Sequence, residues 1–270
     1  MNRRRLRALL GKEWAEAVRN RTVVWTFVLL AAIFVTMPLV LAFGFAGPLL
    51  NELERDPRGA AMLDLLLAYH PTVESLPPEA RVQVMLLRQL LPLFLVLPLM
   101  GGIGIATYSV VGEKVSRSLE PLLATPLTAG ELLLGKTVAA ALPATLGTWI
   151  AFGFFAAGVR GLGGGAFAGV VLDLAAWAMM ALIVPLVALL GIGAGVVVSA
   201  RAKDPRAAQQ IGGLLVLPVV ALVVAQVAGV FLLGPGFVVA AALGLALLDA
   251  ALLAWGSRRF DRERVFVDWR

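Results

Sequence analysis

The stretch VGEKVSRSLEPLLATPLTAGELLLGKTV, residues 111–138, is a polar segment between two long apolar runs, and it decides how the chain is organised. Thr128 and Glu131 have the spacing of a capping box, in which the Thr hydroxyl accepts from a backbone N–H and the Glu carboxylate reaches back. A helix is therefore predicted to start there and to continue into the next apolar run. A shorter helix is predicted over 113–124, because the residue before Pro126 avoids helical backbone angles. The stretch is expected to form an elbow of two helices at a membrane surface.

The elbow contains a sequence that looks like a phosphate-binding loop. Residues 130–137, GELLLGKT, satisfy the spacing G-x-x-x-x-G-K-S/T. A genuine loop of this kind follows a buried strand and turns its backbone N–H groups toward phosphate. Here no strand pattern precedes the first glycine, and the middle residues are Glu131 and three leucines between helical flanks. We interpret the segment as a capped helix that carries a surface Lys136, and expect no cofactor on this chain.

Composition places the chain in a membrane. Of its 270 residues, 60% are hydrophobic, and the mean hydropathy of +0.90 lies beyond that of a soluble domain of this length. The chain has no cysteine, which excludes disulfides and thiolate metal sites, and its single histidine leaves little room for imidazole catalysis. Backbone polar groups in lipid must be satisfied within each segment, so an all-α membrane protein is predicted.

Six apolar segments approach the length of about 20 residues that a helix needs to cross a bilayer. They are residues 22–43, 90–110, 138–158, 170–199, 211–233 and 237–255, within a transmembrane domain over 22–256. Pro185 lies near the middle of the fourth, where a tilt or kink is expected.

The connections between these segments are unequal. Residues 44–89 are the one large outer loop, with short helices expected over 59–70 and 79–89. The acidic residues of this loop form either a cation-attracting vestibule or an ordinary solvated cap. Residues 161–165 are expected to form a flexible turn between the third and fourth spans.

Basic residues indicate the orientation of the spans. With the N-terminus inside, most of the 23 lysines and arginines fall in the inner segments. The positive-inside rule then predicts both termini in the cytoplasm and explains the net charge of +6 without nucleic-acid binding. Residues 1–21 are amphipathic and form either an interfacial helix on the cytoplasmic leaflet or a positive anchor that fixes orientation. Residues 257–270 form a basic cytoplasmic tail.

Few polar residues lie within the expected spans. Asp249, midway along the sixth, is either functional or a protonated side chain bonded to a neighbouring helix, because a carboxylate in lipid is costly. Gln226 in the fifth is expected to hydrogen-bond across a helix interface. Asp173, near the outer end of the fourth, is expected to face headgroups or to cap a helix. Closely spaced glycines indicate close helix packing or a pathway: Gly191 with Gly195, and Gly101 with Gly102.

The polar stretch also resembles part of a known family. GEKVSRSLEPLLATPLTAGELLLGK is similar to the cytoplasmic loop between the second and third spans of ABC-2-type ABC transporter permeases. That loop shows an acidic residue, a short basic stretch, Leu-Glu-x-Leu-Leu, a Pro and a Gly-Lys pair. The matching residues here are Glu113, Arg117, Leu119, Glu120, Leu122, Leu123, Pro126, Gly135 and Lys136. Because the bulk of the outer loops lies between the first two spans, the chain looks closest to the sodium-export and lipid-exporter branches.

The resemblance implies that the elbow, residues 111–137, is a coupling helix that docks on a separate ATPase subunit, which binds ATP and Mg²⁺. It also implies a second permease, identical or paralogous, around a shared pathway, most simply an exporter in the cytoplasmic membrane of a bacterium or archaeon. The implied docking residues are Glu113, Lys114, Arg117, Leu119, Glu120, Leu122, Leu123, Pro126, Glu131 and Lys136. Two alternatives remain open. The first is an intramembrane enzyme, which needs paired carboxylates or a Ser–Lys dyad at membrane depth, and this sequence offers neither. The second is a non-transporting membrane scaffold, which would not stimulate an ATPase.

Overall fold

The computed structural model describes residues 21–59, 71–100, 129–201, 213–214, 216–227 and 234–259, with positions 11, 15, 19, 61, 64, 68 and 210. Every regular element among these residues is helical, which confirms the all-α membrane class. Within the described part of the chain, five helices are long and apolar enough to cross a membrane, and a further apolar helix, Val216–Gln226, is shorter. The five candidate spans are Val24–Leu53, Pro78–Met100, Thr137–Val171, Leu174–Val196 and Pro235–Trp255.

Helix α2 (Arg21–Arg55) is longer than the sequence pattern suggests. Its 35 residues extend about 52 Å at 1.5 Å per residue, against a hydrocarbon core of about 30 Å. The helix therefore does not end at residue 43, where the apolar segment of the sequence ends, but continues past Pro48 to Arg55. The far part of α2 packs against α4 (Pro78–Leu90). The two helices approach closely at Gly47 of α2, because a Cβ atom added to this glycine would lie 3.2 Å from the Glu79 carboxylate of α4.

The second span begins with α4 rather than at residue 90. Pro78 suits the start of α4 for two reasons. Its ring fixes a backbone angle that a helix requires, and it has no N–H, a group that would find no partner in the first turn. The predicted helix over 79–89 is confirmed, and it runs directly into the 3₁₀ turn η2 (Leu91–Leu95). Segment 44–89 is thus not a single loop, since α2 and α4 occupy its two ends and the 3₁₀ turn η1 (Pro71–Ser75) precedes α4.

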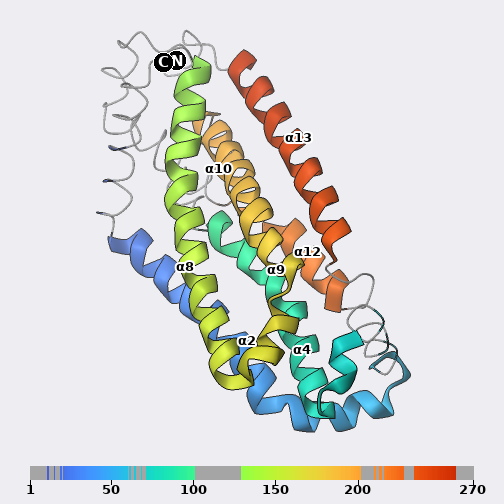
Figure 1. Cartoon of the computed structure of the whole chain (residues 1–270). Coiled ribbons are helices and arrows are strands. Elements are labelled where there is room, and N and C mark those ends of the chain that lie inside the picture. Colours follow the sequence, from blue (N-terminus) through green and yellow to red (C-terminus); the bar gives the residue numbers. More distant parts are fainter. Residues whose placement is uncertain are drawn as a thin grey trace.

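Helix α8 (Ala129–Val171) leads from the end of the polar stretch through the bundle. Its start confirms that a helix enters the third span from this stretch. Gly164 has φ 81° and ψ 176°, angles that are accessible almost only to glycine. The expected turn near residues 161–165 is therefore present as a break at Gly164, and the yellow end of α8 turns away from its long first part (Figure 1). The helix then resumes, so the fourth span begins at Leu174 and not at residue 170.

The fourth span consists of three consecutive pieces. They are α9 (Leu174–Ala178), the π-helical turn η4 (Met179–Ile183) and α10 (Val184–Arg201). The irregular turn lies immediately before Pro185, where the sequence predicts a kink. The last two helices are α12 (Val216–Val227) and α13 (Pro235–Arg259).

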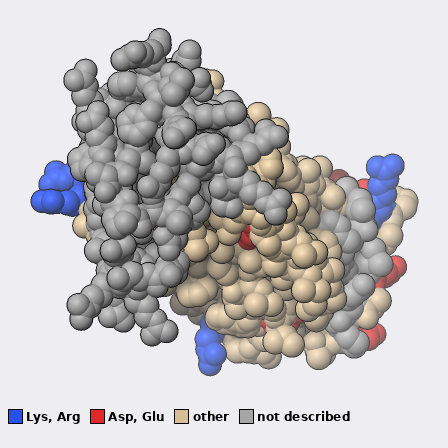
Figure 2. Space-filling view, turned by 90° about the horizontal axis from the view of Figure 1, so that it is seen from above, with Lys and Arg blue, Asp and Glu red and all other residues tan. Residues whose placement is uncertain are grey.

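The helices form a bundle in which α10 packs between α8 and α13, while α2 packs on α4 and α8 (Figure 1). Phe94, Phe152 and Phe155 make an aromatic centre, with ring centroids 5.2 to 6.0 Å apart. Large apolar side chains also point outward, such as Trp25 on α2 and Leu247 on α13. Outward-facing apolar side chains of this kind suit lipid. Figure 2 looks down on the molecule from above, where most of the visible charged side chains of the described residues lie near the margin.

Some of the sequence-based predictions fall outside the described residues. They include nearly all of the amphipathic segment 1–21, the stretch 101–128 with Gly101 and Gly102, most of the expected helix over 59–70, and nearly all of the tail 257–270.

Candidate functional site: a buried polar cluster

Arg88 is the centre of a polar cluster within the bundle. It lies near the end of α4 and is only 5% exposed. Val84, Leu87 and Leu91 are buried at helical spacing around it, so Arg88 belongs to the core-facing side of α4. A buried guanidinium is stable only if partners satisfy its charge and its donors.

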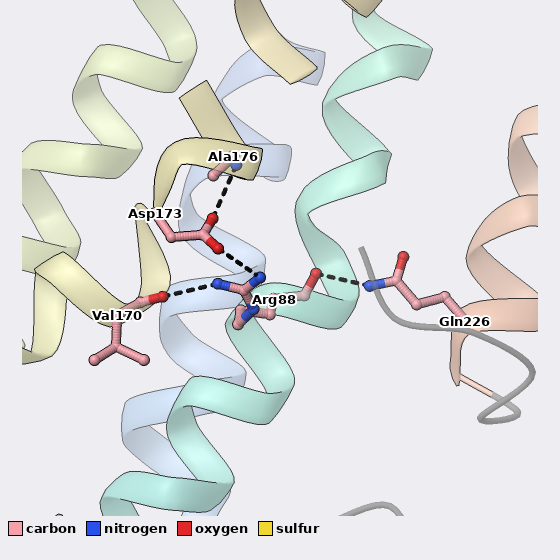
Figure 3. Close-up of polar contacts among 5 residues, drawn as sticks. All are labelled: Arg88, Val170, Asp173, Ala176 and Gln226. Carbon is pink, nitrogen blue, oxygen red and sulfur yellow. Dashed lines mark hydrogen bonds and ion pairs between the residues drawn. The ribbon is translucent and has the colours of Figure 1, made fainter. Parts of the chain in front are cut away.

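Asp173 supplies the opposite charge. Its Oδ2 atom accepts from Arg88 Nη2 at 3.1 Å, and Arg88 Nη1 donates to the carbonyl oxygen of Val170 at 2.8 Å (Figure 3). The Oδ1 atom accepts from the backbone N–H of Ala176 at 3.0 Å, so Asp173 is the N-cap of α9. A carboxylate at a helix N-terminus is further stabilised by the free N–H groups there. One side chain therefore caps the fourth span and ties it to α4.

Gln226 attaches α12 to the same residue. Its Nε2 atom donates to the Arg88 carbonyl oxygen at 3.0 Å, and the side chain is fully buried (Figure 3). This is the hydrogen bond across a helix interface that the sequence predicts for Gln226. Pro92, four residues after Arg88, has no N–H to donate to that carbonyl, which leaves room for the amide of another helix. The Oε1 atom of Gln226 has no hydrogen-bond partner among the described residues.

Asp249 is in a different environment, on α13. It is 7% exposed, and its Oδ2 atom has no hydrogen-bond partner in the described part of the chain. Within the same face of α13, Leu252 approaches Gly193 of α10, where an added Cβ would lie 3.2 Å from Leu252 and 3.4 Å from Thr137 of α8. Asp249 therefore lies one helical turn from the point on α13 where α8, α10 and α13 pack tightly. Among the described residues no group of three His, Cys, Asp or Glu side chains could hold a metal ion.

The Gly191–Gly195 pair lies on the buried side of α10. A Cβ built on Gly191 would overlap the Leu99 side chain in the second span. The close approach expected of this pair is present at Gly191, because a larger residue there would have to displace the Leu99 side chain.

The expected docking residues cannot be placed. Glu113, Lys114, Arg117, Leu119, Glu120, Leu122, Leu123 and Pro126 lie outside the described residues, as do the side chains of Glu131 and Lys136 on α8. Arg88, in contrast, is a residue that the sequence reasoning missed, because it was counted as part of the outer loop. The signal was the helical spacing of its apolar neighbours, which places it on a buried face.

Comparison with known proteins identifies the family. Residues 7–258 match the family described as ABC-2 family transporter protein. The chain belongs to this family. The permease is therefore an integral membrane component of an ABC transporter, with a transport role and not a catalytic one. No curated protein matches the chain.

Proposed function

We propose that the permease forms the translocation pathway of an exporter, together with a second copy or a paralogue. Separate ATPase subunits bind ATP and Mg²⁺ and drive it through the elbow at residues 113–136. The observation that carries this proposal is the position of α8. This helix starts at Ala129, within the elbow, and continues through the bundle to Val171. A push on the elbow would therefore act directly on a spanning helix.

The docking proposal rests on the mixed chemistry of the elbow. Leu122 and Leu123 can fill a groove of the ATPase, while charges such as Glu120 fix the orientation. Alanine at either leucine should weaken ATPase association by about 1–2 kcal/mol, as loss of a buried anchor does. Co-purification and ATPase stimulation in nanodiscs measure this. Leu247→Ala, at a 72% exposed position on α13, is the matched control. Normal association of both elbow variants would refute the docking role.

Orientation follows from the distribution of basic residues, with both termini in the cytoplasm. Because the chain has no cysteine, single-cysteine labelling has no background. Ser75→Cys should react with a membrane-impermeant reagent from outside, and Ser116→Cys should not. The opposite pattern would reverse the topology.

We further propose that the permease itself binds no nucleotide, because the look-alike at residues 130–137 continues as helix α8 from Ala129. Equilibrium binding of labelled ATP to the purified permease should give no saturable signal. A saturable affinity that Lys136→Ala abolishes would contradict this.

A further inference from the structure

The backbone of the fourth span contains a carbonyl that its own helix cannot satisfy. In the π turn, the N–H of Val184 donates to Met179, five residues back. In regular α geometry this N–H would have donated to Met180. If the π pattern continued, the donor to the Met180 carbonyl would be the N–H of residue 185. Residue 185 is a proline and has no N–H. The Met180 carbonyl thus has no backbone donor in either register.

Another helix provides the missing donor. The indole Nε1 atom of Trp149, on α8, lies 2.8 Å from the Met180 carbonyl oxygen and donates to it. In lipid an unsatisfied carbonyl is costly, because no water can replace the lost partner. Trp149 is therefore not only an aromatic side chain at a lipid-facing position. It completes the hydrogen bonding of the neighbouring span at the carbonyl that Pro185 leaves open.

The regions on either side of this turn are held by different contacts. On the α9 side, Asp173 is fixed to Arg88 and Trp177 packs edge-on against Phe152 at 5.2 Å between ring centroids. On the α10 side, Gly191 and Gly193 bring the helix close to its neighbours. A turn that lacks one backbone hydrogen bond, between a segment held by directional contacts and a segment that packs closely on its neighbours, has the form of a hinge.

We propose that the Met180–Pro185 turn is a hinge in the fourth span and that the indole of Trp149 is its latch. The inference rests on the proposed function for its direction, since α8 also begins within the elbow that would receive the ATPase. Displacement of α8 carries Trp149 away from Met180, and the unsatisfied carbonyl then favours a different helical register in residues 179–185. Movement at the elbow is thereby converted into bending of the fourth span.

Hydrogen exchange tests the latch without any ATPase. Trp149→Phe keeps an aromatic ring but removes the donor, and should accelerate exchange of the 179–187 backbone on the order of tenfold, the effect of an unsatisfied buried acceptor. Trp25→Phe, at a 70% exposed position on α2, is the matched control and should leave this segment unchanged.

The proline provides the decisive second variant. Pro185→Ala restores an N–H that can reach Met180 or its neighbour, so Trp149→Phe should have little effect on exchange in that background. If Trp149→Phe accelerates exchange equally with and without the Pro185→Ala substitution, the tryptophan acts through packing and the latch is refuted. Unchanged exchange in the single variant would also refute it.

The coupling role has its own measurement. In the complex with its ATPase subunits, Trp149→Phe should lower the stimulation of ATP hydrolysis by the permease, while Trp25→Phe leaves this stimulation unchanged. Absence of any associated ATPase would overturn the proposed function and leave the exchange result to decide the latch. An exchange effect without any change in stimulation would show that the hinge exists but does not transmit the push, contrary to the inference.

Discussion

Two regions of the permease are held together by opposite means. Where α8 turns into α9, the polar cluster of Arg88, Asp173 and Gln226 joins four helices through directional contacts of 2.8 to 3.1 Å. Where α8, α10 and α13 meet, Gly193 allows Thr137 and Leu252 to come close. The buried carboxylate near that contact, Asp249, has an oxygen without a partner among the described residues.

The difference lies in how each contact responds to movement. A hydrogen bond or ion pair in lipid has no water to fall back on, so separating its partners is costly. Apolar side chains sliding over a glycine surface exchange one set of van der Waals contacts for another. We therefore expect the polar cluster to act as a fixed point and the glycine contact as a surface along which helices can shift.

The largest effect should come from removing the charge at the centre of the cluster. Arg88→Ala removes the cation that pairs with Asp173 and the donor to the Val170 carbonyl, and should lower the free energy of unfolding by about 3 kcal/mol. Thermal denaturation in detergent, followed by circular dichroism, measures the loss. Arg160→Ala, at an exposed position on α8, is the control and should shift the midpoint little. Equal shifts for both variants would mean that the cluster is not a fixed point.

Overfilling the glycine contact should have the next largest effect. Gly193→Leu forces a side chain into space already occupied by Leu252 and Thr137, and should destabilise the bundle by about 1–3 kcal/mol. Gly153→Leu is matched in residue type, but an added Cβ there meets nothing within 4 Å. The same denaturation assay should therefore separate the two. If both leucines are tolerated, the three helices are less tightly packed than the glycine geometry indicates.

A smaller loss is expected at Gln226. Gln226→Met keeps a similar volume but removes one of two donors to the Arg88 carbonyl, the other being the N–H of Leu91, which should reduce stability by about 1 kcal/mol. The loss stays small because the Oε1 atom, which has no partner among the described residues, is removed at the same time. Combining Gln226→Met with Arg88→Ala should give less than the sum of the two single effects, since both act on Arg88. Strict additivity would show that the two interactions are independent.

The smallest effect on stability is expected at Asp249, whose Oδ2 atom has no hydrogen-bond partner among the described residues. Asp249→Asn removes a charge that has no described partner for one oxygen, and should change the free energy of unfolding by less than about 0.5 kcal/mol or increase it. Asp173→Asn, in contrast, keeps an oxygen that can cap the helix but removes the charge that pairs with Arg88, and should be clearly destabilising. A similar loss for both asparagine variants would contradict the comparison. Unchanged stability with lost transport would identify Asp249 as functional.

Local properties of the sequence determine much of this molecule. Apolar length and composition predict an all-α membrane protein with most of its spans, because lipid requires each segment to satisfy its own backbone. The capping pattern near Thr128 predicts a helix entering the third span, and Pro185 predicts an irregularity in the fourth. The need of Gln226 for a partner is also local, since a buried amide in lipid must find one.

The identity of those partners is decided only by tertiary structure. Nothing near Arg88 in sequence indicates Asp173, 85 residues away, and nothing near Pro185 indicates that Trp149 will serve the Met180 carbonyl. The extension of α2 to Arg55 likewise depends on its packing against α4. Hydropathy and helix propensity concern neighbours along the chain, whereas an ion pair or a shared carbonyl depends on which distant surfaces the folded helices bring within hydrogen-bonding distance.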